Sequence, residues 1–146
     1  MKHYLYLILL FLFFTCSITC KGQKDTNSIS YIKYGFSFGY CNGYCYFESK
    51  YDSLKIITIR KSHTVNEADK VDTSKIDPCI WTKLINSFNF KEFKMLPKTI
   101  GCPDCLDGGA EWIEIGTPNK SYKVEFDYGN NIEVFSGLLK LLSQKK

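Results

Sequence analysis

The stretch that decides the fold is residues 110–128, AEWIEIGTPNKSYKVEFDY. Apolar and polar side chains alternate on both sides of the segment GTPNK, residues 116–120, which carries glycine, proline and asparagine. A period of two indicates a strand with one buried face, and turn residues between two such runs favour a hairpin. The sequence therefore predicts antiparallel strands at residues 110–115 and 122–128.

Three further strands are predicted upstream of this hairpin. Residues 32–38 alternate in the same way, residues 44–51 resume after an interruption, and residues 54–60 (LKIITIR) are rich in β-branched side chains. The short links between these runs imply antiparallel pairing. The polar residues 62–74 are expected to form a loop.

Two amphipathic helices complete the pattern. Asp77 and Pro78 supply a cap and a first-turn proline for one helix. Its apolar stripe, and that of a second helix at the C-terminal end, repeat at helical spacing. The stripes are Ile80, Trp81, Leu84, Ile85 and Phe88, then Val134, Phe135, Leu138, Leu141 and Leu142. The order βββ-α-ββ-α predicts an α+β fold, a single antiparallel sheet of about five strands with two helices on one face.

Composition places the chain among globular proteins. It has 146 residues, of which 45% are hydrophobic and 23% are charged. This length suits one domain, which we place at residues 31–146. The net charge is +4, but the lysines are scattered and Arg60 is the only arginine, so a nucleic-acid partner is not expected. His63 is the only histidine after the N-terminal segment and no catalytic elbow accompanies it, so a Ser-His-Asp or Cys-His mechanism is not expected.

The N-terminus indicates export. Residues 5–14 (LYLILLFLFF) form an unbroken apolar run behind Lys2 and His3. Ten residues are about half of the ~20 that cross a bilayer, so the run matches the central region of a signal peptide. We predict a signal peptide at residues 1–19 and a location in the cell envelope.

Lipid attachment is predicted at Cys20. The sequence Ser17-Ile18-Thr19-Cys20 resembles a lipobox, in which the cysteine is alkylated by diacylglycerol and becomes the new N-terminus. Lipidation at Cys16 and simple secretion are the alternatives. Each buried methylene of an acyl chain contributes about 0.8 kcal/mol, so several chains give a stable anchor. Residues 20–30 then form a flexible tether to the periplasmic or cell-surface side of a membrane.

Four later cysteines form two close pairs, CNGYC and CPDC, which are Cys41 with Cys45 and Cys102 with Cys105. An exported protein matures in an oxidising compartment, so disulfides are the first interpretation, with the pairing left open. A zinc site made of the same four thiolates is the second. Thiol-redox catalysis at Cys102 and Cys105 is the third, although nearby acids would raise the thiol pKa. Cys79 is the odd thiol.

Three acidic residues near the second pair are candidate site acids, for a cation or for acid–base chemistry: Asp104, Asp107 and Glu111. Glu111 shares its strand parity with Ile113 and Ile115. If those two face the core, Glu111 is drawn inward and requires a partner.

Five tyrosines cluster on or beside the first predicted hairpin. Sheet packing explains most of them, but a tyrosine-rich loop also suits a protein or glycan partner. The five are Tyr31, Tyr40, Tyr44, Tyr46 and Tyr51.

The motifs CNGYC and GCPDCLDGGAEW, residues 41–45 and 101–112, resemble those of a group of small bacterial lipoproteins of unknown function. The resemblance spans residues 31–142. It implies a cysteine loop, a helix, a second loop that bears cysteine or aspartate, a strand pair and a final helix, and it implies no catalytic activity. We therefore expect a lipid-anchored envelope protein acting as a non-catalytic binding or structural module, without a cofactor. The alternative is a periplasmic metal-dependent or thiol-redox enzyme that uses Cys102 and Cys105.

Overall fold

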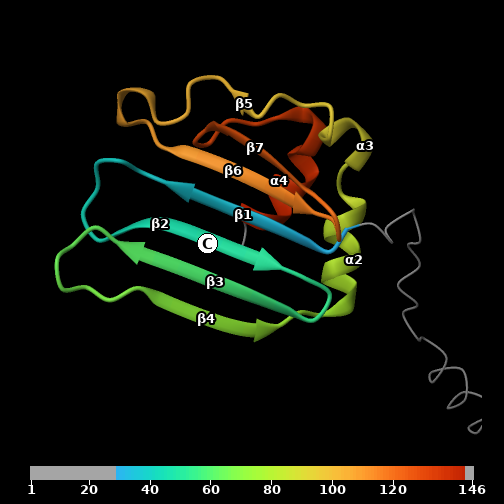
Figure 1. The fold of residues 1–146 in the computed structure, drawn as a ribbon, viewed down its shortest axis with the longest axis horizontal. Coiled ribbons are helices and arrows are strands. Elements are labelled where there is room, and N and C mark those ends of the chain that lie inside the picture. The colour runs from blue at the N-terminus through green and yellow to red at the C-terminus, as the bar shows by residue number, and fades with distance from the viewer. Residues whose placement is uncertain (1–28, 144–146) are drawn as a thin grey trace, which may run out of the picture.

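A seven-stranded sheet organises the computed structural model, which describes residues 29–143 (Figure 1). The strand order across the sheet is β4-β3-β2-β1-β6-β7-β5. All neighbouring strands are antiparallel except β5 and β7, which are parallel. The strands are β1 (Tyr31–Ser37), β2 (Tyr44–Tyr51), β3 (Lys55–Ser62), β4 (Lys70–Lys75), β5 (Thr99–Ile100), β6 (Ala110–Gly116) and β7 (Ser121–Asp127). The predicted signal peptide, Cys16, Cys20 and most of the tether lie outside the described residues.

The predicted sheet was wrong in strand number and in pairing, although the broad α+β class is confirmed. Strand β4 lies almost entirely within residues 62–74, the polar segment that we expected to be a loop, and all six of its residues are exposed. Strand β5 has only two residues, and it adds the one parallel pair. Neither strand has the alternation of buried and exposed side chains that a sequence pattern can reveal.

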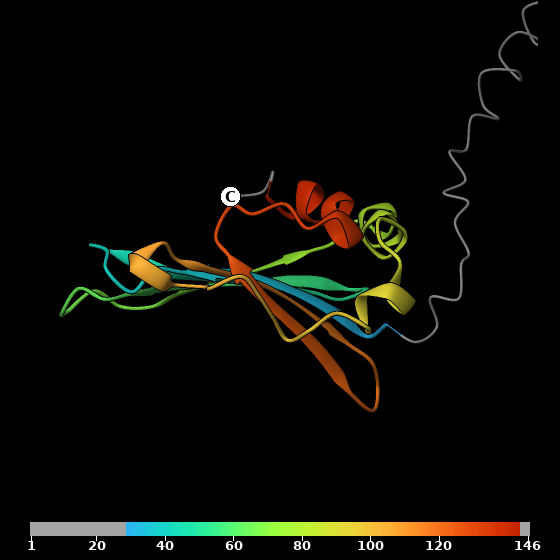
Figure 2. The ribbon, with the colours of Figure 1, turned by 90° about the horizontal axis from the view of Figure 1, so that it is seen from above.

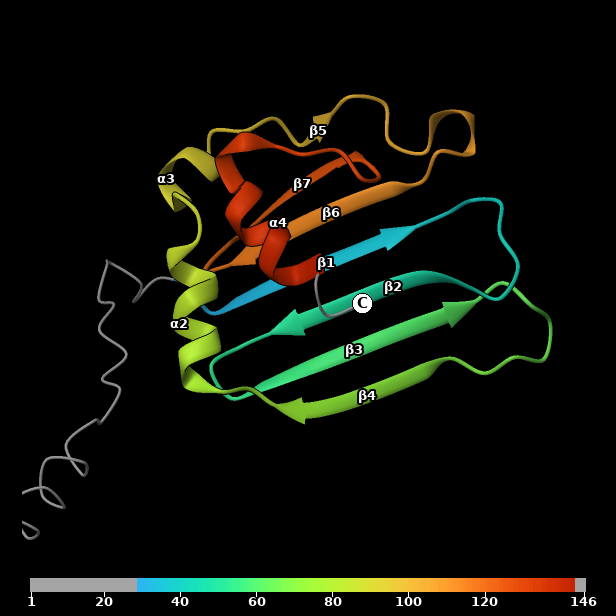
Figure 3. The same ribbon diagram turned by 180° about the vertical axis from the view of Figure 1, so that it is seen from behind.

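The predicted number of helices was also wrong, because the described residues contain three short α-helices: α2 (Pro78–Asn86), α3 (Phe90–Phe93) and α4 (Ser136–Ser143). Helix α2 begins as predicted, with the Asp77 carboxylate accepting the Cys79 N–H at 2.7 Å. Helix α3 is a single turn, and the 3₁₀ turn η3 (Glu133–Phe135) precedes α4. All three α-helices lie on the same side of the sheet, as Figures 2 and 3 show.

The core lies between the sheet and these helices. Complete burial of one large apolar side chain stabilises the folded state by about 1.5–3 kcal/mol. Among residues 29–143, the buried members of the core cluster lie between Ile32 and Leu142, so this part of the chain contains a core of its own. The members are Ile32, Tyr34, Phe47, Tyr51, Ile76, Leu84, Phe93, Ile113, Ile115, Val124, Phe126, Phe135, Leu138, Leu139 and Leu142.

No helix of the described residues covers the other face of the sheet, and the side chains of that face shield one another from solvent. Trp112 lies on this face, yet it is only 6% exposed. Its indole ring occupies the space above Gly35, where a Cβ atom would collide with that ring and approach the Phe47 carbonyl oxygen to 2.6 Å. The Tyr46 ring, at 5.4 Å between centroids, and the Lys123 ammonium, at 5.0 Å, flank the indole. Glycine in the middle of β1 is therefore required by a close approach.

Candidate functional site

The four paired cysteines form two disulfides, and the disulfide prediction is confirmed. Cys41 bonds to Cys45 and Cys102 bonds to Cys105, so each bridge is local to its motif. The Cα–Cα distances of 5.8 and 5.5 Å lie in the ordinary range for disulfides. Cys79 takes part in neither bridge. Two disulfides fit a protein that matures in an oxidising compartment.

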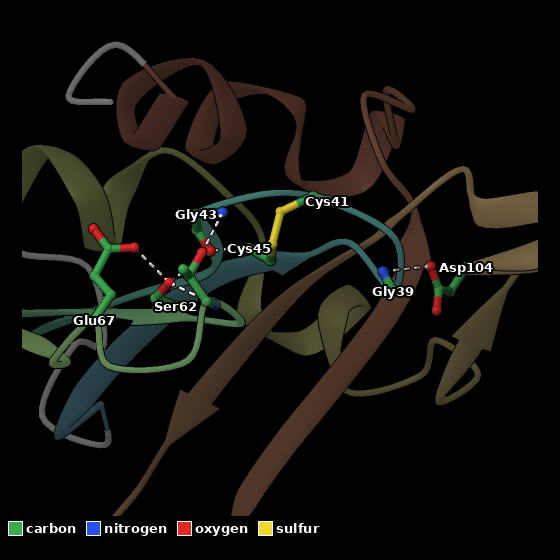
Figure 4. Close-up of a disulfide and its surroundings, with 8 residues drawn as sticks. Gly39, Cys41, Gly43, Cys45, Ser62, Glu67 and Asp104 are labelled. Carbon is green, nitrogen blue, oxygen red and sulfur yellow. Dashed lines mark hydrogen bonds between the residues drawn. A yellow bond between two sulfur atoms is a disulfide. The ribbon is translucent and has the colours of Figure 1, made fainter.

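Both disulfides lie at one end of the sheet because their loops flank two adjacent strands. Residues 38–43 follow β1 and residues 101–109 precede β6, and Ser37 pairs with Ala110 where these strands meet the loops. The Gly39 N–H donates to the Asp104 carboxylate at 3.4 Å, a contact that Figure 4 shows joining the two loops. We call residues 38–43 and 101–109 the disulfide end.

Hydrogen bonds hold the first loop of the disulfide end against the β3–β4 connection (Figure 4). The Gly43 carbonyl accepts the His63 N–H at 3.0 Å, and the Gly43 N–H donates to the Thr64 hydroxyl at 3.2 Å. Gly43 has a φ of 85°, a conformation that glycine adopts without steric cost. The Ser62 hydroxyl donates to the Glu67 carboxylate at 2.6 Å and fixes the neighbouring loop.

The second loop holds three non-glycine residues in the left-handed region. The φ angles of Asp104, Leu106 and Asp107 are 61°, 56° and 58°. Aspartate tolerates this region, but a leucine there is strained by about 1–2 kcal/mol. The Asp104 N–H donates to the Gly109 carbonyl at 3.0 Å, and the Cys102 N–H donates to the Asp127 carboxylate at 3.0 Å. Together with the disulfide, these bonds keep the loop in its strained form.

Large apolar side chains point into solvent at the disulfide end. Leu106 is fully exposed, at 102% of its reference area, and Tyr40 in the other loop is 88% exposed. Behind them, the Tyr128 ring lies 4.7 Å from Phe38 and 5.4 Å from Phe36 between centroids. The disulfide end therefore presents apolar side chains on fixed loops, next to a partly exposed aromatic cluster.

A small pocket of about 210 Å³ lies beside this cluster. The rings of Phe36 and Phe47 stack at 5.1 Å, and the Arg60 guanidinium carbon lies 6.0 Å from the Phe47 ring. Arg60 has no carboxylate within 4.0 Å in the described part of the chain. Pockets for small-molecule ligands are usually about 300–1,000 Å³, so this one suits a single side chain or sugar ring. Its lining residues are Phe36, Tyr44, Tyr46, Phe47 and Arg60.

The structure does not bring the three candidate site acids together. Asp104 and Asp107 are exposed in the second loop, whereas Glu111 is 4% exposed and faces the core. The inward orientation that strand parity predicts for Glu111 is thus observed. Its carboxylate accepts the Tyr34 hydroxyl at 2.7 Å and the Gly129 N–H at 2.9 Å. Burial, and then this hydrogen bond to Glu111, raise the pKa of Tyr34 well above its usual value, so the hydroxyl remains a donor.

Within residues 29–143, no group of three or more His, Cys, Asp or Glu side chains is arranged to hold a metal ion. The zinc alternative requires Cys41, Cys45, Cys102 and Cys105 as thiolates, and it stays a prediction for the reduced protein. In the same range, no helix is long and apolar enough to cross a bilayer.

The burial of the five tyrosines and the exposure of the second loop differ from what the sequence suggests. Tyr51 is buried and Tyr40 is exposed, while the other three tyrosines are half-buried. Sequence reasoning missed Leu106, because its exposure follows from a left-handed backbone that no apolar pattern reveals. It also missed the aromatic cluster, because Phe36 and Phe38 alternate as ordinary core residues do.

Comparison with known proteins adds no relative, since no family model and no curated protein matches this chain. The resemblance to small bacterial lipoproteins therefore remains a prediction that rests on the two cysteine motifs.

Proposed function

We propose that this chain is an exported, lipid-anchored envelope protein whose disulfide end binds a partner protein without catalysing a reaction. The observation that supports this most is the placement of Tyr40 and Leu106, both highly exposed and each next to a disulfide-bonded cysteine, on two adjacent loops. Exposed apolar side chains that gather on one surface mark interaction sites. Loops that are fixed before binding lose less entropy when a partner arrives.

The position of the chain entry supports the same proposal. The described residues begin at Ile29, next to the start of β1, and β1 runs from there to the disulfide end (Figure 1). Seven residues of strand span about 23 Å. A lipid on Cys20, followed by a tether to residue 30, would hold the entry side near a membrane and direct the disulfide end away from it.

The chemistry of the disulfide end suggests what the partner presents. Residues 38–43 and 101–109 contain Asp104 and Asp107 but no lysine or arginine. A protein with an apolar recess and a basic rim would complement this surface. A glycan is the second candidate, favoured by the aromatic pocket that contains Arg60.

The enzyme alternative makes a different demand on the same loops. A metal-dependent or thiol-redox enzyme would require Cys102 and Cys105 as thiols or as zinc ligands. Intact mass under native conditions, with and without reductant, separates the two proposals. A loss of two hydrogens per bridge supports the binding module, whereas bound zinc with all thiols reduced would favour the enzyme.

The anchor is tested by metabolic labelling with palmitate. We expect label in the wild-type chain and in Cys16→Ala, and no label in Cys20→Ala, because only Cys20 follows the lipobox-like sequence. Label that persists in Cys20→Ala would contradict anchoring at this residue.

The binding proposal is tested by placing a photo-crosslinking side chain at Leu106 in cells of the source organism. Leu54, 76% exposed in the β2–β3 turn, is the matched control position. We expect a discrete adduct from position 106 only, and we expect excess wild-type chain, but not excess Tyr40→Ser chain, to suppress it. Equal adducts from both positions, or suppression by both competitors, would overturn the proposal.

A further inference from the structure

A lysine-lined groove lies at the opposite end of the molecule from the disulfides. The groove has a volume of about 440 Å³ and runs between the segment after α3 and the first half of β7. Leu96 and Tyr122 contribute apolar surface to it. Its cationic lining residues are Lys94, Lys98, Lys120 and Lys123.

The groove exists because the sheet is incomplete at this position. Strand β5 pairs only with Glu125 and Phe126 of β7. On that side of β7, residues 121–124 have no neighbouring strand among the described residues, and the groove takes the place of the missing strand. It is therefore open to solvent along a strand edge.

The lysines of this region are largely uncompensated. Residues 89–98 and 117–123, which we call the lysine end, contain five lysines and one glutamate. Within the described part, only Lys123 among the groove lysines has a carboxylate within 4.0 Å, that of Glu125 at 2.9 Å. The Lys94 and Lys120 ammonium groups lie over aromatic rings instead, 5.1 Å from Phe90 and 4.8 Å from Tyr122. An anionic ligand would meet positive charge that the protein itself does not neutralise.

The chain enters the domain at this same end. The Ser30 N–H donates to the Gly116 carbonyl at 2.7 Å, which places the entry beside the β6–β7 hairpin (Figures 1 and 2). An exposed apolar side chain accompanies the lysines, since Met95, next to Lys94, is 84% exposed. Lysines interspersed with exposed apolar side chains form the kind of surface that rests on anionic lipid headgroups.

We infer that the groove binds the phosphate groups of anionic lipids, so that the lysine end lies on the membrane surface. The inference rests on the proposed function only in taking the N-terminal side of the domain as the membrane side. The electrostatic contact does not require the acyl chain. Each lysine near an anionic surface strengthens binding about fivefold.

The test uses a chain of residues 21–146, which retains the whole core and lacks the lipid-bearing cysteine. It is sedimented with vesicles of phosphatidylcholine alone and of phosphatidylcholine mixed with phosphatidylglycerol. We expect binding to the mixed vesicles at low salt, little binding to phosphatidylcholine, and release at high salt. The triple variant Lys94→Gln, Lys98→Gln and Lys120→Gln should bind about 100-fold more weakly, and the corresponding triple arginine variant should bind as the wild type does.

The matched control removes three cations near the disulfide end, through Arg60→Gln, Lys61→Gln and Lys70→Gln. We expect it to retain wild-type binding within about twofold, because those side chains lie far from the proposed contact. An equal loss of vesicle binding in both glutamine variants would show that only the net charge of the protein matters, and it would overturn the inference. Equal binding to both vesicle types would overturn it as well. Displacement from the vesicles by inorganic phosphate at matched ionic strength would also overturn it, because that result would indicate a free phosphate ligand. Because this chain carries no lipid, a negative result leaves the palmitate and crosslinking tests unaffected.

Discussion

Glu111 is the only charged side chain that is buried among the described residues. A carboxylate removed from water is stable only when donors replace its hydration. Here a phenol and a backbone N–H do so, from Tyr34 on β1 and from Gly129 just after β7. The carboxylate therefore links three segments that meet behind the disulfide end, and we assign it a structural role.

We expect Glu111→Ala to lower the free energy of unfolding by about 2–4 kcal/mol, because both donors lose a charged acceptor inside the core. Glu111→Gln keeps an acceptor oxygen and should cost about half as much. Urea unfolding measures both values. A cost below about 0.5 kcal/mol for Glu111→Ala, the range of ordinary surface substitutions, would contradict the structural role.

At the scale of elements, the sequence predicted the longer elements and missed those that are short or fully exposed. The β6–β7 hairpin, β1, β2, α2 and α4 follow from apolar periodicity, because each has one side against the core. Strand β3 follows from its β-branched side chains instead, and none of its eight residues is buried. Strand β4 has six exposed residues and β5 has two residues, so pairing with a neighbouring strand defines them. Helix α3 is a single turn, too short to show an apolar stripe, although its Phe93 is buried in the core. The pairing of the cysteines could not be predicted either, since the spacing permits both local and cross-loop bridges.

The local pairing limits what each disulfide contributes to stability. A bridge between the two loops would close nearly sixty residues and contribute about 4 kcal/mol in the chain-entropy model. The observed Cys102–Cys105 bridge closes a short ring, with a sequence separation of 3, and contributes about 2 kcal/mol in the same model. Its main effect is therefore to fix the conformation of residues 101–109, including the strained Leu106.

We expect the double variant Cys102→Ser and Cys105→Ser to lose about 2 kcal/mol or less of unfolding free energy. Amide hydrogen exchange should accelerate in residues 101–109, while exchange in the paired residues of β1 and β6 should change little. Crosslinking from position 106 should fall, because the loop is no longer fixed before binding. Faster exchange throughout the sheet would show that the bridge stabilises the core and is not confined to its loop.

At the scale of the whole molecule, the two ends of β1 differ in charge and in exposed chemistry. The loops of the disulfide end carry acids and exposed apolar side chains, with Arg60, Lys61 and Lys70 nearby, and the lysine end carries cations beside the chain entry. Composition alone suggested scattered lysines, because the groove gathers side chains from two segments that are distant in sequence. The sheet topology, which places residues 94–98 beside β7, makes them one surface.

The sheet as a whole should lose stability at alkaline pH. The pKa is raised for four tyrosines of the sheet, and burial is the largest cause in each case. Carboxylates near three of them raise it further. The four are Tyr31, Tyr34, Tyr46 and Tyr51. A phenol whose pKa is higher in the folded than in the unfolded chain contributes stability that is fully present below pH ~10. That stability is lost as the pH rises, because the unfolded chain releases the proton first. For Tyr46, whose pKa is raised to about 12, the loss falls between pH ~10 and the folded value.

Urea unfolding across this range should give a free energy that is flat near neutrality and falls above pH ~10. For the fully buried Tyr34, the slope contributed is at most about 1.4 kcal/mol per pH unit. Tyr34→Phe and Tyr46→Phe should each flatten the alkaline decline relative to their own values at neutral pH. If both variants decline as steeply as the wild type, these phenols do not control the alkaline limit, and ionisation elsewhere in the chain must account for it.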